Sequence, residues 1–147
     1  MKITRTTTFT AHQLHCVFNL WNTEYPEQLV YKELRDFKNY LDGITSKRHL
    51  LIQSEEDALL AWGVVFTRTN ERFFAIILAT GFQRKGYGTL LLNELKKDEI
   101  KLSGWVITSD QYKNKMQNPI NLLFPFIKKI ILQFIPKYNF LQIKLLQ

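Results

Sequence analysis

The sequence predicts an α/β (α+β) fold in which helices flank one mixed, mostly antiparallel sheet. Three observations lead to this fold class. Apolar residues recur at helical spacing over residues 10–43, three apolar strands joined by short turns follow, and helices then alternate with strands up to residue 146. The predicted order is β-α-α-β-β-β-α-β-α-β, and turns this short connect antiparallel neighbours.

The first elements are an edge strand and two helices. Residues 2–8 are rich in β-branched side chains and alternate, as short edge strands do. A capping box at residues 10–13 begins the first helix, which ends near Asn22. The second helix is expected to begin near Pro26 and to be capped by Gly43. Its predicted buried stripe comprises Val30, Leu34, Phe37 and Leu41.

The middle of the chain predicts a three-stranded meander over residues 49–53, 59–68 and 72–79, with polar turns between the strands. The third strand is apolar on both faces, which is typical of a central strand in a covered sheet. A Gly-rich segment follows it. The remaining predicted elements are a helix over 90–97, a strand over 105–108, a helix over 119–134 that Pro125 disturbs, and a strand over 140–146.

The composition indicates one domain, 1–147, because 147 residues of which 46% are hydrophobic can bury a core without disulfides. The one cysteine, Cys16, excludes an internal disulfide framework and a zinc site built from cysteine alone, and it is expected to be a small core residue. We find no signal peptide and no transmembrane segment, so a cytoplasmic location is expected. Monomer and homodimer both remain open.

The basic charge is concentrated in the last third of the chain. Of the net charge of +7, residues 101–147 contribute seven lysines against one acid, Asp110. Such a segment is either a solvated face or a surface for an anionic partner. It contains no arginine, and so lacks the pattern of arginines interleaved with aromatics that is typical of a single-strand binding surface. Seven lysines suit diffuse charge better than base readout, so specific nucleic-acid binding is not expected.

The segment that carries chemistry is residues 83–89, between a buried strand and a helix. Gly86 and Gly88 let the backbone approach a ligand, and the first turn of the helix offers unpaired N–H groups. Arg84 and Lys85 add two cations, which together predicts a phosphate site. A Walker A loop is excluded by Tyr87, and a dinucleotide fingerprint by Leu91 at the place of its third glycine.

The remaining pattern, Gln-x-x-Gly-x-Gly after a central strand, resembles the acetyl-coenzyme A signature of the GNAT family of N-acetyltransferases. The order of elements is similar to the GNAT layout over nearly the whole chain. The resemblance implies an acetyl-CoA-dependent enzyme that transfers acetyl directly to an amine of a small molecule or protein. No metal is implied. The residues it assigns to the cofactor are Ile77, Leu78, Ala79, Gln83, Arg84, Lys85, Gly86, Tyr87, Gly88 and Thr89.

Catalytic residues follow less directly from the resemblance. Members of the family often use a glutamate as base and a tyrosine on the last helix as acid, and here Ile127 stands at the tyrosine position. The candidates that replace them are Glu24, Asp110 and Tyr112, with Tyr138 as a further tyrosine. Glu24 would also attract a cationic acceptor, and Tyr25 would form a wall of its pocket.

Two other functions stay open. A GNAT-fold protein that binds acyl-CoA with impaired catalysis would act as a sensor. This alternative is suggested by Ile127, which stands at the position of the family's proton-donating tyrosine. A nucleic-acid binder would use the basic last third. His12 and His15 lie at i, i+3 on one helix, but without nearby carboxylates they predict no metal site. Trp62 is expected to be a core residue.

Overall fold

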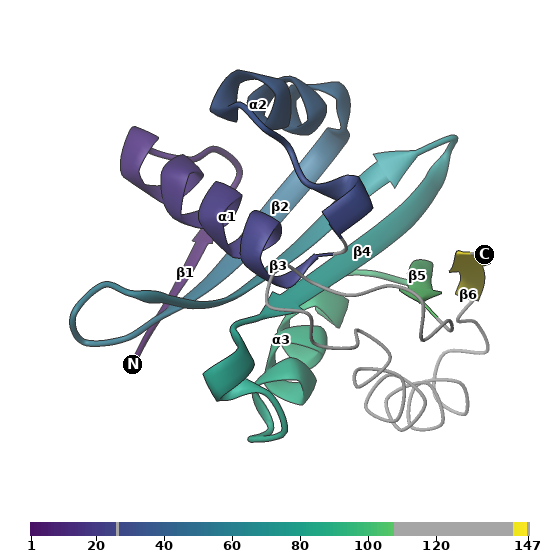
Figure 1. Ribbon diagram of the computed structural model, residues 1–147. Helices are drawn as coiled ribbons and strands as arrows, with labels where there is room; N and C mark the ends of the chain where they lie inside the picture. The colour runs from purple at the N-terminus through teal and green to yellow at the C-terminus, as the bar shows by residue number, and fades with distance from the viewer. Residues whose placement is uncertain (26, 108–142, 147) are drawn as a thin grey trace.

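The computed structural model describes residues 1–25, 27–107 and 143–146. Figure 1 shows the elements in chain order: β1 (Lys2–Thr6), α1 (Ala11–Glu24), the 3₁₀ turn η1 (Glu27–Leu29), α2 (Leu34–Gly43), β2 (Thr45–Gln53), β3 (Leu59–Arg68), β4 (Glu71–Leu78), η2 (Thr80–Phe82), α3 (Tyr87–Lys96), β5 (Gly104–Ile107) and β6 (Ile143–Leu146).

The main sheet has the order β1-β2-β3-β4, and all of its neighbours are antiparallel. The predicted meander is therefore confirmed. β5 and β6 form a separate parallel pair, so the β-structure as a whole is mixed. The α/β fold class with a mostly antiparallel sheet and flanking helices is confirmed.

Two apolar layers enclose the sheet. In Figure 1, α1 and α2 lie on one face of the sheet and α3 lies on the other. Alternate residues of β3 and β4 supply the first layer, in which Trp62 is 1% exposed, as expected for a core residue. The second layer packs Leu91 and Leu95 of α3 against the opposite face. A Cβ on Gly63 would lie 2.9 Å from Leu95 Cδ1, so this glycine lets α3 approach the sheet closely.

The start of the second helix is a correction. α2 begins at Leu34 rather than near Pro26, and Val30 lies outside it. Two hydrogen bonds explain the delay, because Trp21 Nε1 donates to Leu29 O (2.9 Å) and Asn22 Nδ2 donates to Tyr31 O (2.8 Å). These bonds hold the connection against α1 in a non-helical path.

The end of this helix also differs from the prediction. Gly43 is the last residue of α2, and the C-cap is Ile44 in an extended conformation with φ −93°. The chain passes directly from Ile44 into β2, which starts at Thr45 rather than at residue 49. A left-handed glycine cap would turn the chain away from this strand.

No helix within the described ranges is both long and apolar enough to cross a bilayer. The predicted helix over 119–134 lies outside the described residues, as does Tyr138.

Candidate functional site

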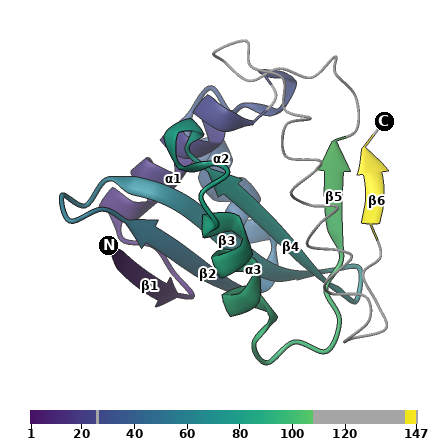
Figure 2. The same cartoon turned by 90° about the horizontal axis from the view of Figure 1, so that it is seen from below.

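The site begins where β4 and β5 separate. These strands run parallel and are joined at Phe73 and Ser103, where Phe74 N–H donates to Ser103 O (2.8 Å) and Ser103 N–H donates to Arg72 O (2.8 Å). Figure 2 shows the two strands side by side at their starts and diverging towards their C-terminal ends. We call the point where they part the apex, defined by Phe74 and Ser103.

An ion-pair network holds the apex in place. Arg72 Nη2 lies 2.6 Å from Glu99 Oε1, and Arg48 Nη2 lies 3.2 Å from the same oxygen. Burial alone would raise the pKa of the Glu99 carboxyl, but hydrogen bonds and positive charge from Arg72 and Arg48 outweigh it and lower the pKa. The segment that leads from α3 into β5 is thereby tied to β4.

Beyond the apex, β4 exposes backbone groups along its free edge. Backbone groups alternate in direction along a strand, and Phe74 N–H points towards β5, so those of Ile76 and Leu78 point the same way. Leu78 O accepts a hydrogen bond from the Gln83 side chain (3.2 Å). Among the described residues no strand pairs with this edge past Phe74, which leaves Ile76 N–H, Ile76 C=O and Leu78 N–H open to an extended ligand.

This geometry refines the predicted pairing of Ile77, Leu78 and Ala79 with a cofactor. Ala79 N–H donates to Leu60 O of β3 (2.9 Å), and Ile77 is in register with Trp62, so the backbone groups of these two residues face the sheet. Gln83 acts through its side chain on the end of β4. The role assigned to these residues stays a prediction.

The loop that follows β4 presents N–H groups. Arg84 (φ +61°) and Gly86 (φ +88°) are left-handed, and Gly86 is the N-cap of α3 with no side-chain cap. The first helical bond runs from Leu90 N–H to Gly86 O (3.0 Å). The three N–H groups before it, those of Tyr87, Gly88 and Thr89, have no partner within the helix and lie at its positive end.

The loop also carries two exposed cations, Arg84 and Lys85, and Lys85 Nζ lies 5.5 Å from the centroid of the Phe82 ring. A ligand with a diphosphate and an extended amide-containing arm fits this arrangement, because the uncapped helix start suits phosphate and the open edge of β4 suits amides. At the apex the Ser103 hydroxyl is buried and has no hydrogen-bond partner within the described part of the chain.

Glu24 lies at the loop end of β4. Its Oε1 accepts hydrogen bonds from the N–H of Thr80 (3.0 Å) and from the Thr80 hydroxyl (3.0 Å). Thr80 is six residues beyond Phe74, which corresponds to about 20 Å of extended chain. Glu24 therefore lies far from the apex along β4, where it ties the end of α1 to the turn that precedes the loop.

Glu71, which the sequence reasoning did not select, is the carboxylate on the other side of the apex. It is the first residue of β4 and, by alternation with Phe73, faces α1 and α2. Its Oε2 atom is buried and has no hydrogen-bond partner among the described residues. The sequence predicted that this strand begins at residue 72. A predicted start at residue 71 would have placed Glu71 on the same face as Phe73 and made it a candidate.

Three tyrosines surround Trp21 on this face. The ring centroids of Tyr25, Tyr31 and Tyr40 lie 4.0, 5.8 and 5.5 Å from that of Trp21. Burial, and then the neighbouring Tyr40, raise the pKa of both Tyr25 and Tyr31, and the Arg68 charge offsets part of this effect. These two phenols stay protonated at neutral pH and are hydrogen-bond donors.

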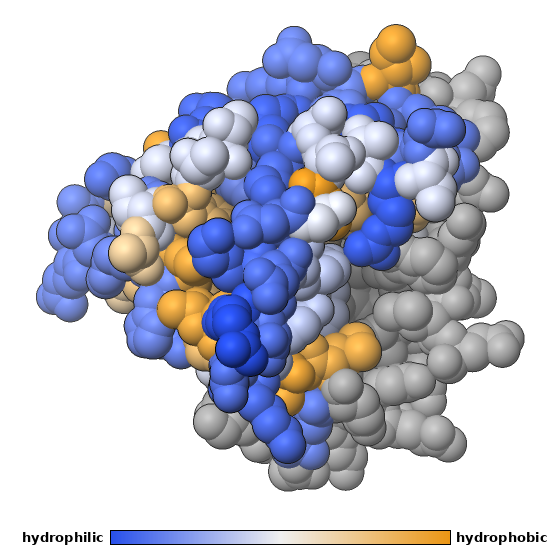
Figure 3. All heavy atoms as spheres, turned by 90° about the horizontal axis from the view of Figure 1, so that it is seen from above, coloured by the Kyte–Doolittle hydropathy of each residue, from blue (hydrophilic) through white to orange (hydrophobic). Residues whose placement is uncertain are grey.

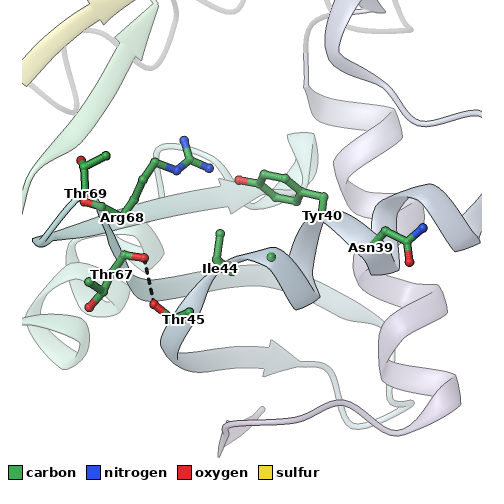
Figure 4. A pocket seen from close by; sticks show the side chains of 8 residues that line it. Asn39, Tyr40, Ile44, Thr45, Thr67, Arg68 and Thr69 are labelled. Carbon is green, nitrogen blue, oxygen red and sulfur yellow. Dashed lines mark hydrogen bonds between the residues drawn. The ribbon is translucent and has the colours of Figure 1, made fainter.

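A pocket of about 420 Å³ adjoins the tyrosines, between the end of α2 and the β3–β4 turn. Tyr40 and Arg68 are among its lining residues, and Figure 4 shows their polar ends directed towards one another across it. Figure 3 looks onto the face covered by α1 and α2, where hydrophilic residues dominate and apolar ones emerge in small patches.

The other predicted site residues, Asp110 and Tyr112, lie outside the described residues, as does Ile127. The described ranges contain no group of three or more His, Cys, Asp or Glu side chains that would hold a metal. Cys16 is half-buried rather than fully in the core, and its Sγ lies 3.6 Å from His12 Nε2.

No protein-family model and no curated protein matches this sequence. Solved structures do match. An aminoglycoside 6'-N-acetyltransferase complexed with coenzyme A gives a TM-score of 0.60 at 12% identity, over 88% of this chain and 83% of that chain. A GNAT superfamily phosphinothricin acetyltransferase from Sinorhizobium meliloti, in complex with AcCoA, gives 0.54 at 15% identity. A protein described as a putative phosphinothricin N-acetyltransferase gives 0.51 at 18% identity.

The last two alignments cover 66% and 65% of this chain, and span 59% and 65% of the matched chains. At these identities the likeness shows the fold alone. The chain thus has the fold of GNAT N-acetyltransferases, as the resemblance in its sequence implied.

Proposed function

We propose that this chain is a GNAT-family N-acetyltransferase that moves an acetyl group from acetyl-CoA to an amine. The observation that carries the proposal is that β4 pairs with no described strand on this edge past Phe74, at the end of the strand that leads to the uncapped start of α3. The fold neighbours crystallised with coenzyme A or AcCoA support it. Neither the acetyl-CoA signature nor the fold selects an acceptor.

The residues that would hold acetyl-CoA follow from the open hydrogen-bonding groups. The N–H groups of Tyr87, Gly88 and Thr89 would bind the diphosphate, with Arg84 and Lys85 adding positive charge. The outward backbone groups of Ile76 and Leu78 would bind the two amides of the pantetheine arm. When bound, acetyl-CoA supplies a thioester whose C–S bond breaks as the new amide bond forms.

Glu71 is the base in this proposal. Its unpartnered carboxylate oxygen, on the acceptor side of β4, would take the proton of the acceptor amine directly or through one water. Glu24 becomes a positioning residue, because its hydrogen bonds to Thr80 fix the turn from which the phosphate loop starts. The catalytic and substrate-binding roles predicted for Glu24 are replaced by this role in the proposal.

Tyr31 is the proposed proton donor to the departing sulfur. A tyrosine phenol is protonated at neutral pH, and burial raises the pKa of Tyr31 further. Asn22 fixes the backbone of this residue through Tyr31 N–H (3.0 Å to Oδ1) and Tyr31 O (2.8 Å to Nδ2). Tyr25 instead stacks on Trp21 with an interplanar angle of 11°, and its role as a wall of the acceptor pocket stays a prediction.

The experiment is a thiol-release assay with acetyl-CoA and a panel of amines. Amine-dependent release of coenzyme A, with a matching acetylated product by mass spectrometry, is the expected result. Binding of acetyl-CoA with no release for any amine would favour the alternative, a GNAT-fold sensor with impaired catalysis.

A further inference from the structure

Arg68 differs from the other arginines at its end of the sheet. Arg48 and Arg72 both form ion pairs with Glu99. Arg68, the last residue of β3, has no carboxylate partner among the described residues, and its guanidinium carbon lies 5.4 Å from the centroid of the Phe66 ring. Such a cation is available to a ligand, and arginine pairs with carboxylates through two parallel hydrogen bonds.

The pocket that Arg68 lines is otherwise polar and uncharged. Its other polar side chains are those of Asn39, Tyr40, Thr45, Thr67 and Thr69. In Figure 4 the guanidinium extends over this space towards the Tyr40 hydroxyl, while Thr45 Oγ1 donates to Thr67 O (3.4 Å) at its edge. With one cation and no acid in the lining, the pocket favours an anionic group.

The proposed base lies beside this cation. Arg68 and Glu71 are register partners across the β3–β4 turn, and alternation places both on the face of α1 and α2. Opposite residues in an antiparallel pair have Cα atoms about 5 Å apart. No ion pair joins the two side chains, and Glu71 Oε2 has no hydrogen-bond partner within the described residues. Arg68 and Glu71 thus bring opposite charges to facing positions of β3 and β4, with no hydrogen bond or ion pair between their side chains.

We propose that the acceptor is a small zwitterion, a free amino acid, whose carboxylate binds Arg68 and whose amine is directed to Glu71. The inference rests on the proposed function for the acetyl-transfer reaction. The pocket and the facing positions of Arg68 and Glu71 are observed independently of that reaction. An acceptor that lacks the carboxylate would leave Arg68 unpaired and would bind more weakly. Acetyl transfer to the amine also removes the positive charge that Glu71 recognises, so the product would leave more readily than the substrate binds.

Matched pairs of probes test this proposal. The panel consists of the proteinogenic amino acids, each beside its carboxamide, which keeps the amine and the size but removes the negative charge. Thiol release from acetyl-CoA gives kcat and KM for each member. In parallel, tryptophan fluorescence, to which Trp21 in the tyrosine cluster contributes, follows binding of the same probes without acetyl-CoA.

The variants are Arg68→Gln and, as a matched control, Arg35→Gln. Arg35 is an exposed arginine of α2 whose side chain is 75% accessible. We expect at least one amino acid to be preferred over its carboxamide by about ten-fold or more in kcat/KM. Arg68→Gln should abolish that preference by raising KM for the acid alone, and Arg35→Gln should keep it.

Two failures are distinguishable. If acetyl-CoA does not bind but an amino acid still quenches or enhances fluorescence in an Arg68-dependent way, the proposed reaction is wrong and the zwitterion pocket stands. If acetyl-CoA binds and no probe pair shows an Arg68-dependent difference in either measurement, the zwitterion proposal is overturned and the proposed function survives. Equal loss for acid and carboxamide in Arg68→Gln would also overturn it.

Discussion

The carboxylate of Glu24, the last residue of α1, accepts hydrogen bonds from both the backbone N–H and the hydroxyl of Thr80, each 3.0 Å long. These bonds link the helix on one face of the sheet to the turn that leads to the uncapped start of α3 on the other. The end of α1 is thus tied directly to the turn that precedes the loop over residues 83–89.

Removing this link should weaken acetyl-CoA binding without abolishing it. Glu24→Ala and Thr80→Val should each raise the Kd for acetyl-CoA about three- to ten-fold, because the loop loses its anchor. The double variant should be little worse than either single one, with a coupling of about 1 kcal/mol in a double-mutant cycle. Isothermal titration calorimetry measures these values.

The control for this cycle is Glu56→Ala, in the exposed turn between β2 and β3, which should bind like wild type. Additive losses in the double variant would show that Glu24 and Thr80 act independently. A large loss of kcat with unchanged Kd in Glu24→Ala would instead return Glu24 to the catalytic role that the sequence suggested.

Substitution of Glu71 should affect turnover rather than cofactor binding. Glu71→Gln keeps the size of the side chain but removes the base, so kcat should fall about 10²–10⁴-fold. The Kd for acetyl-CoA should stay within a factor of about two, since Glu71 lies on the other side of the apex from the loop. Steady-state kinetics and calorimetric titration with acetyl-CoA measure kcat and Kd for the variant.

Tyr31 can be separated from Tyr25 by the same assay. Tyr31→Phe should lower kcat at least about ten-fold, because it removes the proposed proton donor and leaves the ring. Tyr25→Phe is the matched control and should change kcat less than Tyr31→Phe, because Tyr25 stacks on Trp21 at 4.0 Å and acts through its ring. The reverse order of effects would assign proton donation to Tyr25.

The buried His49 predicts a pH dependence of stability. Its side chain is 1% exposed, its Nδ1 accepts a hydrogen bond from Trp62 Nε1 (3.2 Å), and burial, helped by Lys47, lowers its pKa to about 4. At pH values between the ordinary histidine pKa of 6.5 and the lowered pKa of about 4, His49 binds a proton in the unfolded chain but not in the folded one. Stability is therefore complete above about pH 6.5 and decreases as the pH falls to about 4, by up to about 3 kcal/mol.

Urea unfolding at several pH values measures this dependence. His49→Leu should flatten the free energy of unfolding between pH 6.5 and pH 4 relative to wild type, whatever its effect on the absolute value. His15→Leu, an exposed position on α1, is the control and should keep the wild-type slope. An unchanged slope in His49→Leu would assign the acid sensitivity to the carboxylates.

Local signals in the sequence were sufficient for much of the fold and for the loop. The capping box of Thr10 and Gln13 is present with both hydrogen bonds, and the meander follows the predicted turns. Gly86 could be identified from the sequence because a left-handed N-cap conformation favours glycine, so the residue type itself marks the position.

Features that depend on distant contacts could not be predicted in this way. α2 starts late because Trp21 and Asn22 of α1 hold the preceding connection, and neither bond is visible in the periodicity of the second helix. The pairing of Glu24 with Thr80 joins residues 56 positions apart. The juxtaposition of Arg68 and Glu71 could have been found from the turn between them, but its meaning depends on which face α1 and α2 cover.

The central claim is that the open edge of β4 and the start of α3 bind coenzyme A. It is tested most directly by calorimetric titration with acetyl-CoA, coenzyme A and ATP of three proteins: the wild type, Gly86→Val and Gly43→Val. Gly86 has φ +88°, which a β-branched residue adopts only with strain, whereas Gly43 is a helical glycine with open space around it. We predict micromolar binding of both coenzyme A species by the wild type and by Gly43→Val, weak ATP binding, and loss of binding in folded Gly86→Val. Failure of the wild type to bind either coenzyme A species, or full binding by Gly86→Val, would contradict the account.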